Sequence, residues 1–502
     1  MKELTKLSKI VSSVTGYAYA SAKDLKLYCK EELFLKNLEE GAYKNDADAA
    51  ADLYNSGPDD VRYKMLKHRV KNRLYGNLNF VDPDKSGLND VRKKELECNN
   101  LLYQANVLRL QYEFGLVTSV ANKALVIARE LDFTDLEVNA LELLNLSYSE
   151  LGSSKKFLTV QKELRHALER FIKEREAVSI FQHVTVQLRK SIKTRKEFLP
   201  ELPEIIRQLE DLWLSSGTFS AFDAYYKTFI WYHELEGNFK EIISITVNSL
   251  KLVDNNKVNS HRFDLMYNNY ILVYAHLRAK DFSNGLQYAE KNLSLYNTSS
   301  LNWFAYMENY FLLAVHAKQY ELGNILLQQV FDNFSFSSVP TTARERWMLY
   351  LSYFRLIYPQ ATLTGNEAKN PYLLSLPEYS KDKLGFNVAI LTLQYIYLLE
   401  KGDSEALLYR IESLKKYIST HLKDVFSLRS KLFLKLLILA FTEGYDAEQS
   451  RRKGENLYRR LIATPAPGDA YAEIEIVPYE HLWDLILQIL TRKENGIDTR
   501  LK

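Results

Sequence analysis

Short polar breaks recur along this chain between segments that have a helical pattern. Three of them look alike: Glu236–Phe239 (EGNF), Ala279–Phe282 (AKDF) and Lys318–Tyr320 (KQY). Each follows a segment rich in aromatic residues and precedes one of about 15 residues whose apolar side chains recur at three- and four-residue spacing, the period of an α-helix. The breaks lie roughly 40 residues apart, an interval typical of helical repeats. Because one amphipathic hairpin cannot bury its apolar face alone, the pattern predicts hairpins that stack on one another.

The rest of the sequence also favours an all-α fold. From about Leu88 onward the apolar residues keep the helical spacing almost throughout. With 18 Gly and 11 Pro in 502 residues, turn-rich β-sandwiches and Gly-rich nucleotide-binding loops are disfavoured. The one candidate strand is Ile474–Val477 (IEIV). A chain of this length is expected to form several domains or one extended array.

A helix, a tight turn containing Gly, Asn or Asp, an aromatic residue and a second helix resemble a tetratricopeptide repeat. In that family a small residue stands three positions after the turn aromatic, and here Gly285 and Gly323 stand three after Phe282 and Tyr320. Ile242 replaces the small residue in the first of the three units, and larger residues occupy the family's small position in the first helix. These larger residues are Ile230, Val273 and Phe311. The resemblance covers roughly residues 90–440.

The resemblance implies a right-handed α-solenoid whose groove is lined by the first helix of each hairpin and holds a protein or peptide. The candidate groove residues are Tyr226, His233, Tyr267, His276 and Tyr310. We expect an all-α, tetratricopeptide-like solenoid with a small helical N-terminal domain. The expected division is 1–87 for the N-terminal domain with its basic helix at 59–75, 88–357 for the repeats, 358–385 for a linker or long loop, and 386–502 for C-terminal hairpins and a capping helix.

The N-terminal region contains a strongly basic helix. Residues 46–73 are expected to form a short helix, a Ser-Gly-Pro break and a second helix, and residues 61–80 contain six Lys or Arg and no acid. The formal net charge of the whole chain is only +3, so the positive charge is local. The outline at residues 46–75 resembles a helix-turn-helix, in which a basic helix reads DNA. The candidate contact residues are Arg62, Lys64, Lys67, Arg69, Lys71 and Arg73.

A helical wheel gives two interpretations of this helix. At about 100° per residue, Tyr63, Leu66, Val70 and Leu74 form one apolar stripe. The basic side chains flank that stripe in two ribs, one of Arg62, Arg69 and Arg73 and the other of Lys64, Lys67 and Lys71. Long side chains form such ribs when their stems cover the edge of a core, whereas a recognition helix aims its contacts outward. A structural helix or a dock for an acidic partner is the first interpretation, and nucleic-acid contact is the alternative.

The sequence contains no catalytic arrangement of a known kind. Phosphate-binding loops, dinucleotide fingerprints and Gly-x-Ser-x-Gly elbows are absent. The nine histidines include no pair at three- or four-residue spacing that could hold zinc. His233, His276 and His316 lie near the ends of first helices in three repeats. We interpret them as amphipathic residues beside the turns, with a row of stacked histidines along one groove as the alternative.

These features predict a non-enzymatic scaffold, adaptor or sensor that binds a protein or peptide, with no catalytic residues, no cofactor and no metal site. Cys29 and Cys98 have no partner motif, which indicates reduced thiols and a cytoplasmic location. No apolar run approaches the ~20 residues that span a bilayer, so we expect no membrane partner. The alternative function is a DNA-binding transcriptional regulator, with the helix-turn-helix at its N-terminus and the repeats as its sensor region.

Overall fold

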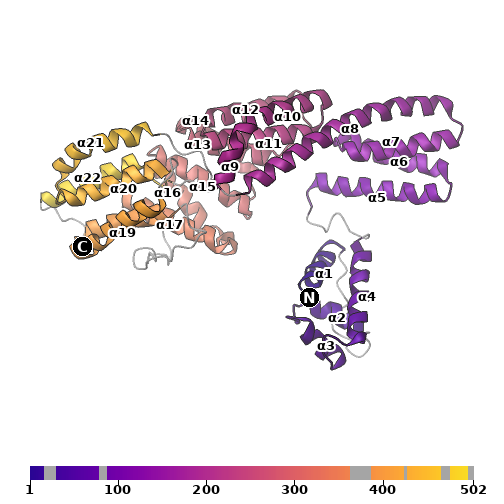
Figure 1. Cartoon of the computed structure of the whole chain (residues 1–502), viewed down its shortest axis with the longest axis horizontal. Helices are drawn as coiled ribbons and strands as arrows, with labels where there is room; N and C mark the ends of the chain where they lie inside the picture. The colour runs from indigo at the N-terminus through magenta and orange to yellow at the C-terminus, as the bar shows by residue number, and fades with distance from the viewer. Residues whose placement is uncertain are drawn as a thin grey trace. The chain divides into compact units, whose positions relative to one another are not determined.

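A computed structural model describes residues 1–15, 30–78, 88–190, 192–361, 386–422, 427–464 and 475–495 (Figure 1). Within these ranges every regular element is a helix and no strand is formed, which confirms the all-α class. The chain divides into two compact units. The first unit comprises Met1–Arg175 with Ser215–Phe219, and the second comprises Glu176–Leu214 with Ser220–Lys502. The division of the chain at residues 87, 357 and 385 stays a prediction.

The first unit begins with four helices that share a core. They are α1 (Lys2–Thr15), α2 (Lys30–Glu39), α3 (Asp46–Tyr54) and α4 (Val61–Asn77). The side chains that the wheel placed on the apolar stripe of α4 are at most 1% exposed; they are Tyr63, Leu66, Val70 and Leu74. They pack with Phe34 and Leu35 of α2 and with Leu53 of α3. The stripe predicted for the basic helix is therefore confirmed.

A second core in the first unit is built from helices that are neighbours in sequence. These are α5 (Asp90–Leu110), α6 (Phe114–Glu130), α7 (Thr134–Glu150) and the part of α8 (Ser154–Leu188) up to Arg175. Helix α5 packs on α6, α6 packs on α7, and α5 also contacts α7. Small side chains such as Ala121, Ala124 and Ala128 are fully buried between them. Helices that follow one another in the sequence therefore lie side by side in this core.

The second unit contains the remaining helices. Their bounds are α9 (Ile192–Phe198), α10 (Leu202–Ser216), α11 (Phe219–Glu236), α12 (Phe239–Asp254), α13 (Leu265–Arg278), α14 (Phe282–Asn292), α15 (Leu301–His316), α16 (Tyr320–Phe331), α17 (Thr341–Ile357), α18 (Asn387–Lys401), α19 (Ser404–His421), α20 (Leu428–Thr442), α21 (Ala447–Ala463) and α22 (Tyr479–Glu494). Consecutive helices pack from α12 to α16 and from α17 to α22, and α13 also contacts α15. One continuous apolar core runs from Val273 to Leu490. The helices on both sides of the expected linker share that core, and residues 362–385 lie outside the described residues.

One turn geometry recurs at seven helix–helix junctions in the part of the chain that the structure describes. Two positions before the next helix stands a residue with a left-handed backbone, with φ between 52° and 75°: Tyr112, Asp132, Gly152, Gly237, Lys280, Lys318 and Gly402. The following residue donates its N–H to the carbonyl five positions back, as Asp281 does to His276 at 3.0 Å and Gln319 to Ala314 at 2.8 Å. This pairing is the Schellman motif, which satisfies carbonyls at a helix end. The breaks predicted at Glu236–Phe239, Ala279–Phe282 and Lys318–Tyr320 are confirmed as turns between helices.

Two glycines allow neighbouring helices of the second unit to approach closely. A Cβ at Gly285 would lie 2.8 Å from Cδ2 of Leu313 and 2.9 Å from Cβ of His276. A Cβ at Gly323 would lie 2.9 Å from Cε2 of Phe354. Real Cβ atoms do not come so close to other atoms, so only glycine fits at either position without displacing its neighbours. These are the two glycines that stand three residues after a turn aromatic.

The C-terminal helices are held by Arg429 of α20, which is 2% exposed. Its guanidinium donates hydrogen bonds to the carboxylates of Glu475 and Glu480 and to the carbonyls of Leu461 and Thr464. The segment predicted as a strand forms none at residues 475–477; Ile474 lies outside the described residues. That prediction was wrong because this segment is fixed by ion pairs and buried side chains instead of by a neighbouring strand. No described helix has both the length and the apolar character needed to cross a membrane.

Candidate functional site

Each basic side chain of α4 is paired with a carboxylate of the same four-helix group. The shortest contacts are Arg62–Asp60 at 2.7 Å, Lys64–Asp59 at 2.8 Å, Lys67–Asp46 at 2.6 Å, Arg69–Glu31 at 2.7 Å, Lys71–Glu3 at 2.8 Å and Arg73–Glu31 at 3.9 Å. Six cations therefore face five carboxylates. An anionic partner at this helix would have to displace pairs that already exist, which removes much of its electrostatic gain.

Asp46 is the best-connected of these carboxylates. Its Oδ1 accepts hydrogen bonds from the Tyr63 hydroxyl and the Lys67 ammonium, both at 2.6 Å, and its Oδ2 lies 3.4 Å from the N-terminal amine of Met1. Burial opposes ionisation of Asp46, but the hydrogen bonds from Lys67 and Tyr63 outweigh it and lower the pKa of Asp46 to about 2. The pair Lys67–Asp46 thus ties α4 to the start of α3, which is a structural role.

The outer face of α4 exposes two apolar side chains. Val61 is 68% exposed and Met65 is 57% exposed. Next to them, the His68 ring is hydrogen-bonded to the Asn72 amide at 3.1 Å. No other described helix covers Val61 or Met65. The six candidate contact residues therefore border a small apolar surface, and their role toward a partner stays a prediction.

In the second unit, three of the five candidate groove residues are buried: Tyr226, His276 and Tyr310. Tyr226 is 2% exposed, and its hydroxyl donates a 2.6 Å hydrogen bond to Asn268, which in turn donates to the Thr246 carbonyl at 3.3 Å. Tyr310 is 4% exposed. Tyr267 is half-buried and packs edge-on against Tyr226, with ring centroids 6.5 Å apart. Of these three tyrosines, only Tyr267 reaches the surface.

The three repeat histidines have different surroundings. His276 is buried, stacks on Tyr288 and hydrogen-bonds through Nδ1 to Asp281 at 3.0 Å. The Nε2–H of His316 donates to the Glu475 carbonyl at 2.8 Å. His233 is half-buried against Phe229, with ring centroids 4.3 Å apart, and burial lowers its pKa. The three rings make separate local contacts beside the turns.

A surface that the sequence did not single out lies along the first helices of consecutive hairpins. We call it the tyrosine face and define it by half-buried side chains: Asp223, Lys227 and Glu234 of α11, Tyr267, Tyr270 and Tyr274 of α13, Glu308 of α15 and Arg346 of α17. On α13 the three tyrosines stand at i, i+3 and i+7, which places them on one side of the helix. The four helices thus present rings and charges together.

Hydrogen bonds cross the tyrosine face from one hairpin to the next. The Tyr274 hydroxyl donates to Glu234 at 2.9 Å. Glu308 accepts from the Tyr350 hydroxyl and from Arg346, the latter at 3.2 Å. Burial, and then the charges of Glu234 and Asp223, raise the pKa of Tyr267. The hydrogen bond between Glu234 and Tyr274 joins α11 and α13 at this surface.

A cleft of about 250 Å³ opens beside Glu234 at one end of the tyrosine face. Its wall includes the ring of Trp231, which stacks on Phe181 with centroids 5.2 Å apart. The lining residues are Thr185, Leu188, Arg189, Arg195, Trp231, Glu234 and Leu235. The cleft combines an indole and two leucines with charged groups of both signs, Glu234 and the two arginines, and so suits a side chain with an apolar stem and a polar end.

The described residues contain no group of three or more His, Cys, Asp or Glu side chains that could hold a metal ion. Cys98 is fully buried, and burial raises its pKa to about 11, so its thiol is unreactive near neutral pH. No known family model matches the sequence, and neither curated proteins nor solved structures include a significant match.

Two hydrogen-bonded pairs in the second unit are separated by the same number of residues. Tyr226 and Asn268 are 42 residues apart and hydrogen-bonded, and so are Glu308 and Tyr350. Polar and aromatic residues that recur at one repeat length can therefore be examined as cross-hairpin pairs. Glu234 and Tyr274, which are 40 residues apart, follow the same rule less closely.

Proposed function

We propose that this chain is a non-enzymatic, cytoplasmic scaffold built on tetratricopeptide-like, right-handed helical hairpins. Its tyrosine face binds an extended segment of a partner protein, and the cleft beside Trp231 receives one side chain of that segment. No cofactor takes part in this function.

Local geometry supports the repeat architecture. The same left-handed turn separates the helices at seven junctions among the described residues, and consecutive hairpins pack on one another. Gly285 and Gly323 occupy positions where helices meet too closely for a Cβ. Tetratricopeptide hairpins need a small residue at the corresponding place for this reason. Hydrogen bonds between residues 42 positions apart tie one hairpin to the next.

One observation carries the binding proposal: Glu234 belongs both to the tyrosine face and to the lining of the cleft that contains Trp231, the Trp231 cleft. Its carboxylate accepts a hydrogen bond from Tyr274 and also lines the cleft. Tyrosine and tryptophan supply a large contact area at low entropic cost, and both are enriched where proteins recognise partners. A carboxylate between them can accept hydrogen bonds from backbone N–H groups of the bound segment.

The alternative, a DNA-binding regulator, requires phosphates to displace carboxylates from α4. Lys67 already lies 2.6 Å from Asp46, and Lys71 lies 2.8 Å from Glu3. We therefore propose that α4 is a structural helix. Measuring duplex DNA binding at low salt tests this point: salt-dependent binding that Lys67→Glu with Lys71→Glu abolishes would establish the regulator instead.

Selection of peptides from a random library on the immobilised full-length chain tests the scaffold proposal. Peptides of about ten residues span ~35 Å when extended, enough to cross several helices. We expect an enriched class whose affinity falls by about tenfold or more in the variant Trp231→Ala with Glu234→Gln. The control, Tyr409→Ala with Glu321→Gln, changes exposed residues of α19 and α16 and should retain full affinity. Equal binding by the two double variants would refute the proposed site.

A further inference from the structure

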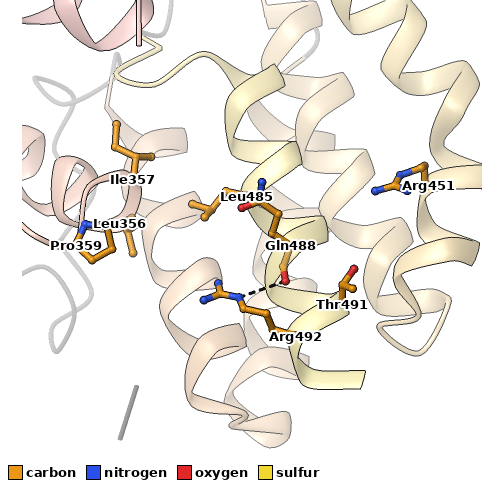
Figure 2. Close-up of a pocket in the computed structure, with 8 residues that line it drawn as sticks. All are labelled: Leu356, Ile357, Pro359, Arg451, Leu485, Gln488, Thr491 and Arg492. Carbon is orange, nitrogen blue, oxygen red and sulfur yellow. Dashed lines mark hydrogen bonds between the residues drawn. The ribbon is translucent and has the colours of Figure 1, made fainter. Parts of the chain in front are cut away.

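A second cleft lies in the C-terminal part of the second unit, between the end of α17 and the helices α21 and α22 (Figure 2). Its volume is about 460 Å³. The lining residues are Leu356, Ile357, Pro359, Arg451, Leu485, Gln488, Thr491 and Arg492. None of these residues belongs to the tyrosine face or to the Trp231 cleft. We call this site the arginine cleft.

Both charged side chains of the arginine cleft are cations without a carboxylate partner among the described residues. Arg492 donates from Nε to the Gln488 carbonyl at 3.3 Å, the bond drawn in Figure 2, and this contact leaves its charge uncompensated. The guanidinium of Arg451 forms no hydrogen bond or ion pair with any described residue, and Glu455, one turn further along α21, pairs with Arg459 instead.

The next two cations of α21 have side-chain partners, unlike Arg451. Lys453 is paired with Glu443 at 2.6 Å, and Arg452 donates to Gln449 at 2.8 Å. Helix α21 as a whole carries five Lys or Arg against two Glu, so the potential around the cleft is positive. On α4 all six cations are paired. The arginine cleft therefore has two cations without a carboxylate partner among the described residues, whereas α4 has none.

The rest of the cleft is apolar or hydrogen-bonding. Leu356 and Ile357 end α17, Pro359 follows that helix, and half-buried Leu485 comes from α22. Thr491 and Gln488 add a hydroxyl and an amide on the α22 side, next to Arg492 (Figure 2). A ligand that fills this site must bring an apolar group to the leucines and an anionic group to the guanidinium groups.

We propose that the arginine cleft docks an acidic segment of a partner protein, in which a Leu, Ile or Phe side chain is flanked by Asp or Glu. The apolar side chain contacts Leu356 and Leu485 while the carboxylates pair with Arg451 and Arg492. Guanidinium groups bind carboxylates through two parallel hydrogen bonds, which gives such pairs both strength and orientation. A nucleic acid fits less well, because it gains affinity from many cations along a backbone and offers no aliphatic group to the cleft.

Peptide selection on the full-length chain and on the variant Arg451→Gln with Arg492→Gln tests this proposal. We expect a class of peptides that the unmodified chain retains and the variant loses, rich in Asp or Glu next to Leu, Ile or Phe. Their affinity, measured by fluorescence anisotropy, should fall by about tenfold or more in the variant, as expected when charge-assisted hydrogen bonds are lost. Leu485→Ala should also weaken binding, without changing its dependence on salt.

The matched control is Arg460→Gln with Lys493→Gln. It removes the same charge from exposed residues of α21 and α22 that do not line the cleft, and it should weaken binding by no more than about twofold, the effect of a distant surface charge. Equal losses in the two double variants, the absence of such a peptide class, or a requirement for duplex DNA in place of peptide would each overturn the proposal. The variant Trp231→Ala with Glu234→Gln should still bind this class of peptides. The two proposals can therefore fail separately.

Discussion

The hydroxyl of Tyr226 on α11 donates a 2.6 Å hydrogen bond to Oδ1 of Asn268 on α13, 42 residues further along the chain. Both side chains are buried, and Asn268 also donates to the carbonyl of Thr246 on α12. One polar pair thus joins three helices of two consecutive hairpins. A buried polar group stabilises the fold only while its partners are present, so this pair also enforces the register between hairpins.

Tyr226 and Asn268 should be energetically coupled, so that their separate contributions to the free energy of unfolding are not additive. We expect Tyr226→Phe to lower the free energy of unfolding by about 1–3 kcal/mol, because Asn268 then keeps a buried acceptor without its donor. Adding Asn268→Leu should cost less than the sum of the two single changes. All five tryptophans lie in the second unit, so urea unfolding followed by tryptophan fluorescence reports on this unit. Additive losses would contradict the coupling.

Gly285→Ala should destabilise the second unit by about 1–3 kcal/mol, since its Cβ would overlap both Leu313 and His276. The same unfolding measurement checks it. Ser283→Ala, at an exposed position of the same helix, is the control for helix propensity and should be neutral or slightly stabilising. If Gly285→Ala is as stable as the control, α14 does not pack as closely as described.

The first unit should lose stability in acid through Asp46. Its folded pKa of about 2 lies below the ordinary value of 3.8, so its ionised form stabilises the fold above about pH 4, and this contribution disappears as the pH falls toward 2. Hydrogen exchange of α3 and α4, corrected for intrinsic rates, should show the loss of protection over that range. In Lys67→Gln the loss should begin at a higher pH because the main hydrogen bond that lowers the pKa is gone. An unchanged profile would exclude Asp46 as the cause.

The second unit should lose stability already between pH 6.5 and 4 through His481. Burial, and then the charges of Lys318 and His316, lower its pKa from 6.5 to about 4. Over this pH range His481 is protonated in the unfolded chain but stays neutral in the folded chain. The free energy of unfolding therefore falls as the pH falls. His481→Phe should reduce this dependence. Urea midpoints at pH 7 and pH 5 measure it, and an identical pH dependence in the variant would contradict the prediction.

The sequence predicted the features that depend on local pattern. Periodic apolar residues gave the helices, the repeated breaks gave the turns, and the wheel of α4 gave the buried stripe of Tyr63, Leu66, Val70 and Leu74. These features follow from residues a few positions apart, where periodicity and turn chemistry act.

Contacts between distant residues could not be predicted in this way. Glu3 and Glu31 lie far in sequence from the cations of α4, so nothing local indicated that the basic helix is neutralised by its own unit. Arg429 likewise meets Glu475 and Glu480 only through tertiary packing. Of the candidate groove residues, Tyr226, His276 and Tyr310 are buried in the core, while Glu234 on α11 and Tyr270 and Tyr274 on α13 are half-buried.

Photocrosslinking tests the central claim, that the tyrosine face binds a partner segment, most directly. A peptide selected on the full-length chain and sensitive to Trp231→Ala with Glu234→Gln would carry a photoreactive group at successive positions, and the crosslinked residues would be located by mass spectrometry. We predict crosslinks on α11, α13 and α15, at or beside Glu234, Tyr267, Tyr270 and Glu308. Crosslinks confined to the second helices α12, α14 and α16 would contradict the account.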